Sequence, residues 1–138
     1  MVSLDSLVIP TGAGSALDTI TLVAVYQDPG FFENYYRFKI ERNGDMLDQI
    51  IINDDVLNNG ITAVTPLFDA FFSSGDEVEV FLLGLDQTVF RYFSTLSTVN
   101  GGAGLATAAV ADPVSNISNG ALGYFSAQTQ SSRSIKIP

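Results

Sequence analysis

Apolar and charged side chains alternate strictly along residues 36–41, and Arg42 then leads into Asn43-Gly44. Successive side chains of a strand point to opposite faces, so the pattern predicts a strand with one buried face. Asn-Gly favours a type I′ turn, because that turn needs positive φ at both central positions. A hairpin closed there predicts four cross-strand pairs that match apolar side chains or unlike charges: Arg42–Asp45, Ile40–Leu47, Lys39–Asp48 and Tyr36–Ile51.

Further strand patterns occur on both sides of this hairpin. Runs rich in β-branched or alternating residues, bounded by Gly, Pro, Asn or Ser, predict strands over residues 19–26, 50–52, 61–64, 77–83 and 123–130. Residues 77–83 become apolar on both faces, which predicts a central strand. The opening residues indicate a polar arm and residues 131–138 a polar tail, whereas residues 67–72 fit either a strand or a helix turn.

One helix is predicted near residues 86–99. Asp86 can cap its N-terminus, and Asn100-Gly101 can end it. A single stripe at helical spacing contains five apolar side chains, Val89, Tyr92, Phe93, Leu96 and Val99. Residues 1–138 are therefore predicted to form a single, mainly β domain: an antiparallel β-sandwich, immunoglobulin-like or related, with one helix.

The composition excludes several classes of function. Fifteen acids against six bases give a net charge of −9, which disfavours binding to nucleic acid or to an anionic membrane surface. The chain has no Cys and no His, so thiolate or imidazole zinc sites and Ser–His–Asp or Cys–His catalysis are excluded. No run of about eighteen apolar residues is present, so no transmembrane helix is predicted.

An acidic loop offers the best oxygen donors for a metal ion, namely Asp54, Asp55 and Asn58. Calcium takes six to eight oxygens from such side chains, but the spacing does not match the twelve-residue calcium loop. The loop therefore indicates a solvated turn between strands. No metal and no cofactor are expected.

Aromatic residues occur as neighbouring pairs, Phe31-Phe32, Tyr35-Tyr36, Phe71-Phe72 and Tyr124-Phe125. Neighbours on a strand face opposite ways, so one member of each pair would leave the core unless the sheet is covered on both sides. Phe31 and Phe32 follow Pro29-Gly30, which places them on a loop. They are the best candidates for binding a partner.

Carboxylate pairs could in principle hydrolyse glycosides, with Asp69 between Phe68 and Phe71 as the one acid in an apolar setting. Acidic chains contain such pairs by chance. We therefore expect a chain that is not an enzyme.

Several motifs occur in a characteristic order, ending on Ser-Asn-Ile-Ser-Asn-Gly-Ala-Leu-Gly-Tyr-Phe-Ser-Ala over residues 115–127. The earlier ones are Tyr35-Tyr36-Arg37-Phe38, Arg42-Asn43-Gly44, Asp54-Asp55 with Asn59-Gly60, residues 74–80, and Asp86 before Tyr92-Phe93. Over roughly residues 19–127, the chain resembles the C-terminal part of the Bacteroidetes domain-of-unknown-function family 4249.

The resemblance implies a fragment of a longer outer-membrane lipoprotein, often encoded beside a TonB-dependent receptor, and it implies no catalytic residues. We therefore expect a non-enzymatic accessory or binding domain of the cell envelope, whose partner is an outer-membrane receptor or another envelope protein. The alternatives are a structural or adhesive β-module for assembly and a carboxylate-dependent glycoside hydrolase.

Overall fold

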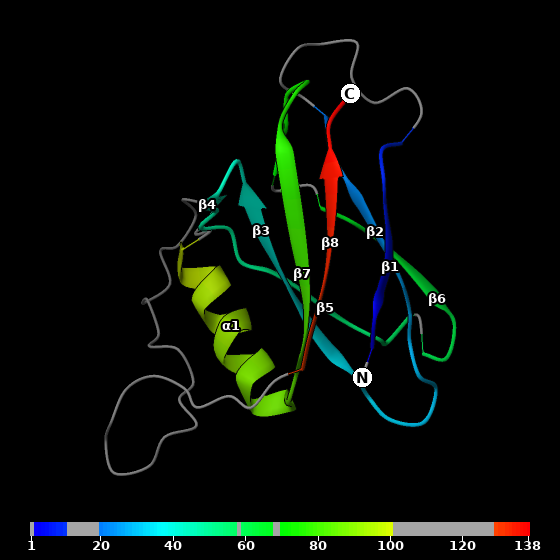
Figure 1. The fold of residues 1–138 in the computed structure, drawn as a ribbon. Helices are drawn as coiled ribbons and strands as arrows, with labels where there is room; N and C mark the ends of the chain where they lie inside the picture. Colours follow the sequence, from blue (N-terminus) through cyan, green and yellow to red (C-terminus); the bar gives the residue numbers. More distant parts are fainter. Residues whose placement is uncertain (1, 11–19, 58, 68–69, 101–128) are drawn as a thin grey trace.

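The computed structural model describes residues 2–10, 20–57, 59–67, 70–100 and 129–138. Along them lie β1 (Leu4–Val8), β2 (Val23–Gln27), β3 (Tyr35–Arg42), β4 (Asp45–Met46), β5 (Ile51–Asp54), β6 (Thr62–Pro66), β7 (Glu77–Leu85), α1 (Gln87–Asn100) and β8 (Thr129–Lys136). The strands form two antiparallel sheets: β1-β2-β6, and β4-β3-β7-β8 with β5 also paired to β3. The large sheet lies between the small sheet and α1 (Figure 1). The predicted mainly β, sandwich-like architecture with one helix is confirmed.

The pairing of β3 with β7 is the longest ladder of the large sheet that involves β3. Eight residue pairs join the two strands, from Tyr35–Leu85 to Arg42–Val78. One face of this ladder packs against the small sheet: Phe38, Val80 and Leu82 share a buried cluster with Ala24 and Tyr26 of β2. On the outer face of β7, Leu83 and Leu85 are buried as well, and β7 lies between β3 and β8, which confirms the predicted central strand.

The helix covers that outer face. The Asp86 carboxylate accepts a hydrogen bond from the Val89 N–H (2.8 Å), so the predicted N-cap is confirmed. Val89 and Phe93 are buried against Leu83 and Leu85 of β7. The Arg37 guanidinium lies 4.0 Å from the centre of the Phe93 ring, a cation–π contact between β3 and α1.

The hairpin turn forms as predicted, but the register of the returning strand does not. Asn43 and Gly44 have φ of 53° and 90°, and Arg42 pairs with Asp45. Ile51, however, pairs with Phe38, and Tyr36 pairs with Asn53, so the predicted Tyr36–Ile51 pair is wrong. Four residues, 47–50, lie on the return strand opposite only two of β3, which shifts the register by two. An even shift preserves the faces, so Ile51 is still buried.

Two predictions about the ends of the chain are wrong. The polar arm contains β1, where Leu4 is buried and its N–H donates to Ser131 Oγ (3.0 Å). The polar tail contains most of β8, which pairs with β7 over eight residues. The side chains of residues 129–134 do not alternate between apolar and polar. This strand therefore forms through backbone hydrogen bonds to β7, whose side chains are largely buried. The rest of the strand predicted over residues 123–130 lies outside the described residues, as do residues 115–127, Phe68 and Asp69.

Asn43 also joins two turns at one end of the large sheet. Its side chain donates to Asp76 Oδ1 (2.9 Å) and accepts from the Glu77 N–H (2.9 Å). The other Asp76 oxygen accepts from the Ser73 N–H (2.9 Å), which closes a turn over residues 73–76. The hydrogen bond from Ser73, then that from Asn43 and the charge of Arg42, lower the pKa of Asp76.

The Gly44→Val substitution tests the turn. A Cβ at Gly44 would meet nothing within 4 Å, so the cost comes from its φ of 90° alone. We expect the free energy of unfolding in urea to fall by about 2 kcal/mol, and by about 1 kcal/mol for Gly44→Ala. Gln49→Val, at an exposed position nearby on the return strand, is the control. Equal stability of Gly44→Val and wild type would contradict the type I′ turn.

The Asp76→Asn substitution tests the hydrogen bonds that join the two turns, through the pH dependence of the stability they confer. Because folding lowers the pKa of Asp76, its contribution is fully present above the unfolded value of about 3.9 and is lost as pH falls through the folded value. Wild type should therefore be more stable than Asp76→Asn at pH 7, and the gap should close by about pH 2. Urea unfolding at both pH values measures it, with Asp48→Asn as the control. A gap that stays constant with pH would be the contrary result.

Candidate functional site

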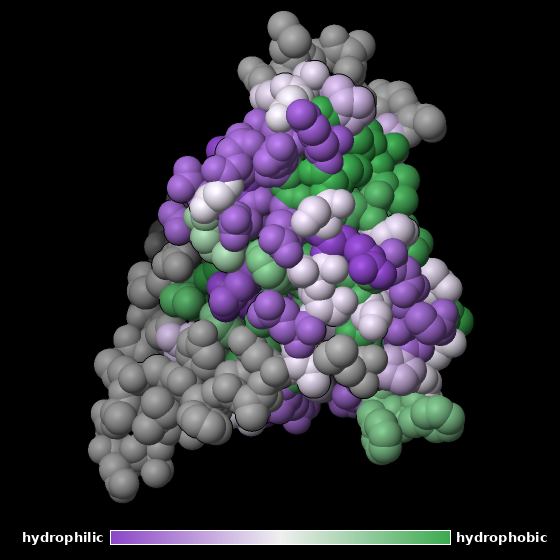
Figure 2. Space-filling view, viewed as in Figure 1, coloured by the Kyte–Doolittle hydropathy of each residue, from purple (hydrophilic) through white to green (hydrophobic). Residues whose placement is uncertain are grey.

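Five exposed apolar side chains lie on two loops at one end of the sandwich. Phe31 and Phe32, in the loop between β2 and β3, are 87% and 76% exposed. Val56 and Leu57, in the loop between β5 and β6, are 76% and 88% exposed, and Ile61 is exposed as well. Figure 2 shows the first loop as a hydrophobic projection at the lower right. We call these five residues the loop tip.

A buried carboxylate holds the two loops together. Asp28, at the start of the first loop, is only 1% exposed. It accepts one hydrogen bond from the Tyr36 hydroxyl and another from the Gly60 N–H of the second loop (3.1 Å). The Asp28 N–H in turn donates to the Ile61 carbonyl (3.1 Å). The carboxylate is therefore bonded on both oxygens, as burial of a charged group requires.

A second buried carboxylate repeats the connection further along. Asp55, 3% exposed, accepts from the Asn34 N–H (2.9 Å), and its own N–H donates to the Asn34 carbonyl (3.2 Å). The Asn34 amide also donates to the carbonyls of Pro29 (3.0 Å) and Phe32 (2.8 Å). Hydrogen bonds thus hold the backbone beside Phe32 within the first loop and also join it to the second loop.

The two loops touch backbone to backbone at a pair of glycines. A Cβ added to Gly30 would lie 2.9 Å from the Gly60 Cα, too close for any side chain there. Gly60 also has a φ of 79°, which glycine adopts without strain. Glycine at both positions lets the two loops that carry the loop tip meet backbone to backbone.

Two buried tyrosines support the loops from the sandwich core. Burial, followed by the hydrogen bond to Asp28, raises the pKa of Tyr36 far above its usual range. Burial also raises the pKa of Tyr26, whose hydroxyl accepts from the Asn53 amide (3.1 Å). The Tyr36 hydroxyl therefore remains a proton donor to Asp28 throughout the physiological pH range.

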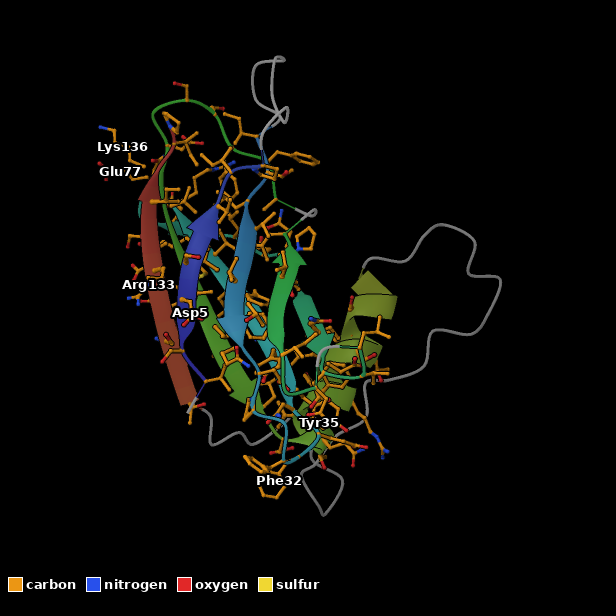
Figure 3. All side chains as sticks on the ribbon, turned by 90° about the vertical axis from the view of Figure 1, so that its right-hand side faces the viewer. Asp5, Phe32, Tyr35, Glu77, Arg133 and Lys136 are labelled. Atoms are coloured by element: carbon orange, nitrogen blue, oxygen red, sulfur yellow. The ribbon has the colours of Figure 1, made fainter. Side chains whose placement is uncertain are left out.

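The structure separates the predicted site residues. Phe31 and Phe32 lie in solvent on the predicted loop, as Figure 3 shows for Phe32 at the lower end, and their binding of a partner stays a prediction. Asp54 accepts from the Val56 N–H (3.2 Å) while Asp55 bonds Asn34, and Asn58 lies outside the described residues. Within the described ranges, no three His, Cys, Asp or Glu side chains gather where a metal could bind.

Sequence reasoning missed Val56 and Leu57, because their segment was interpreted as a solvated turn, and Ile61, because it was assigned to the strand predicted over residues 61–64. The sequence signal that could have revealed the second loop was the apolar pair Val56-Leu57, which lies between Asp54-Asp55 and Asn59-Gly60. The prediction for paired aromatics is confirmed on β3: Tyr36 is buried in the sandwich, while Tyr35 packs on Phe90 of α1, with ring centres 4.8 Å apart.

An open groove of about 330 Å³ lies at the opposite end of the large sheet. Its lining includes Glu41, Glu79 and Lys136, and Glu79 accepts from the Ser132 hydroxyl (2.8 Å). Glu41 and Glu79 are directly opposite each other on β3 and β7. This lining indicates no particular class of ligand, so the loop tip is the better candidate site.

These observations define a sandwich-like β domain with an apolar loop tip stabilised by buried carboxylates. No helix in the described part of the chain has the length and apolar character to cross a bilayer. The family model described as "Domain of unknown function (DUF4249)" matches residues 5–134, and the chain belongs to this family. Comparison with curated proteins and with solved structures found no match.

Tyr36→Phe tests the support of the loops. The substitution removes the hydroxyl that donates to Asp28 and leaves a buried carboxylate with one bond fewer, so the free energy of unfolding should fall by about 1–3 kcal/mol. Amide hydrogen exchange should also accelerate in residues 28–34 and 59–61. Tyr35→Phe removes the hydroxyl that donates to Glu33 but leaves the bonds to Asp28 intact, so it should not accelerate exchange in residues 59–61. Unchanged exchange in Tyr36→Phe would show that Asp28 does not hold the loops.

Proposed function

We propose that this chain is a non-catalytic binding domain of a cell-envelope protein that docks on a protein partner through the loop tip. The observation that carries the proposal is the exposure of Phe31, Phe32, Val56 and Leu57 on loops that buried hydrogen bonds hold together. Large exposed apolar side chains that gather at one place are typical of protein interaction sites.

Two features of the loop tip favour binding. The hydrogen bonds beneath it order the loops before a partner arrives, which reduces the conformational entropy lost on binding. Aromatic side chains that can be fully buried at the centre of an interface supply much of its binding energy. The absence of Cys and His from the chain supports a function without nucleophilic catalysis.

The partner belongs to the cell envelope in this proposal because of the resemblance. Related chains are implied to be outer-membrane lipoproteins encoded beside TonB-dependent receptors, so a receptor of that class is the first partner to test. The domain would then assist nutrient uptake as an accessory to the receptor.

A structural module for assembly is the second candidate, favoured by the outer face of the small sheet. Two rows cross its three strands, Val8–Val23–Pro66 and Ser6–Val25–Val64, and no charged residue stands in either row. Three strands of five residues span about 240 Å² at usual spacings, well below the roughly 800 Å² per partner of a stable interface. This valine face alone is therefore the weaker candidate.

The double variant Phe31→Ser/Phe32→Ser tests the proposed function. The measurement is crosslinking, in cells of the source organism, between the full-length protein and the TonB-dependent receptor encoded beside it. We expect this crosslinking to fall at least about tenfold, as when residues at the centre of an interface are lost. Val64→Ser, on the valine face, is the matched control and should leave crosslinking unchanged. Loss of crosslinking in Val64→Ser alone would favour the assembly module instead.

A further inference from the structure

The two loops that form the loop tip carry charge of one sign only. Residues 28–34 and 54–61 contain four acids, Asp28, Glu33, Asp54 and Asp55, and no Lys or Arg. Asp28 and Asp55 are buried and bonded inside, whereas Glu33 is exposed and Asp54 half-buried. The apolar loop tip is therefore flanked by two carboxylates that reach solvent.

Hydrogen bonds from the large sheet and the helix hold one of these carboxylates in place. The Tyr35 hydroxyl donates to Glu33 Oε2 (2.9 Å), and the Gln87 side chain at the start of α1 donates to the Tyr35 hydroxyl (3.1 Å). Glu33 follows Phe32 directly in the sequence. Its charge is thus positioned beside the apolar surface, and a partner would meet it at the rim of the interface.

Three of the basic side chains that the structure describes make their contacts outside the two loops. Arg37 stacks on Phe93, and Arg133 donates to the Asp5 carbonyl between β8 and β1 (3.2 Å). Lys136 lies beside Glu77 at the end of the sandwich opposite Phe32 (Figure 3). The negative charge at the loop tip is not offset by a base within its own loops.

We propose that the loop tip docks into an apolar pocket of a protein whose rim carries Lys or Arg side chains. This inference rests on the proposed function and adds the chemistry of the partner. An apolar centre with a charged rim is the usual anatomy of an interface, and opposite charge on the partner steers encounter and fixes orientation.

Charge also favours this kind of partner over two other candidates that could cover an apolar surface, a bilayer and a second copy of this chain. An anionic bilayer would repel Glu33 and Asp54. A second copy of this chain would bring the same two carboxylates face to face, and like charges across an interface are costly. A basic-rimmed protein pocket is the occupant that satisfies both the apolar centre and the acidic rim.

A titration followed by amide NMR tests the inference on the intact chain. The probe is an amphipathic helical peptide of Leu and Lys, whose apolar stripe is flanked by ammonium groups, and the comparison is a Leu–Glu peptide of equal length. We expect shifts confined to residues 28–34 and 54–61, with the Leu–Lys peptide binding at least about tenfold more tightly. Equal affinity for both peptides, or shifts centred on residues 77–79, would overturn the proposal.

Vesicles test the competing occupant. Phosphatidylcholine vesicles, with and without phosphatidylglycerol, should leave the amide spectrum unchanged. Broadening of the tip amides by either vesicle at concentrations where the Leu–Lys peptide causes no shift would show a lipid-binding loop and overturn the inference.

Charge-reversal variants distinguish the effect of a carboxylate at the rim on binding from the effect of the net charge of the chain. Glu33→Lys should weaken binding of the Leu–Lys peptide about twofold to fivefold, and Phe31→Ser/Phe32→Ser should weaken it about tenfold or more. Glu77→Lys, with the same change of net charge at the opposite end, is the matched control and should change affinity less than Glu33→Lys. Equal effects of Glu33→Lys and Glu77→Lys would reduce the effect to net charge and overturn the inference. The proposed function would still stand if Phe31→Ser/Phe32→Ser abolished receptor crosslinking.

Discussion

The antiparallel pairing of β3 with β7 is the constraint on which the rest of the structure depends. Every second residue of this ladder faces the small sheet, and the others face α1 or solvent. Burial of apolar surface on both sides of β7 holds the two sheets and the helix as three layers. The same pairing places Tyr36 in the core and Tyr35 on the helix side. One tyrosine can then hold Asp28 beneath the loop tip while its neighbour holds Glu33 at the rim.

The loop tip shows how buried polar groups can serve an exposed apolar surface. Asp28 and Asp55 are removed from water, a cost that hydrogen bonds from Tyr36, Gly60 and Asn34 offset. Two of these bonds join the two loops, from Gly60 to Asp28 over 32 residues of sequence and from Asn34 to Asp55 over 21. Phe31, Phe32, Val56 and Leu57 are thus exposed on loops that hydrogen bonds join, although none of them is needed to fill the core.

Local patterns predicted the elements whose signals lie within a few residues. Asn43-Gly44 encodes its turn because both residues tolerate positive φ, and Asp86 encodes the helix start because its carboxylate reaches an N–H three residues on. The exposure of Phe31 and Phe32 followed from Pro29-Gly30. The register beyond residue 47 was not predictable, since the two extra residues in the return strand leave the alternation of faces unchanged.

Two-residue periodicity, turn chemistry and capping were thus sufficient for the β class, the central hairpin and the helix. Long-range packing decided the remainder. β8 forms because backbone groups of β7 pair with it, although its own side chains are mostly polar, and β1 forms by pairing with β2. Distant partners also bury Asp28, and they bury Asp55, which its sequence had placed in a solvated turn. The physical reason is that a hydrogen bond or a buried contact depends on which segments meet in space, and periodicity within one segment does not contain that information.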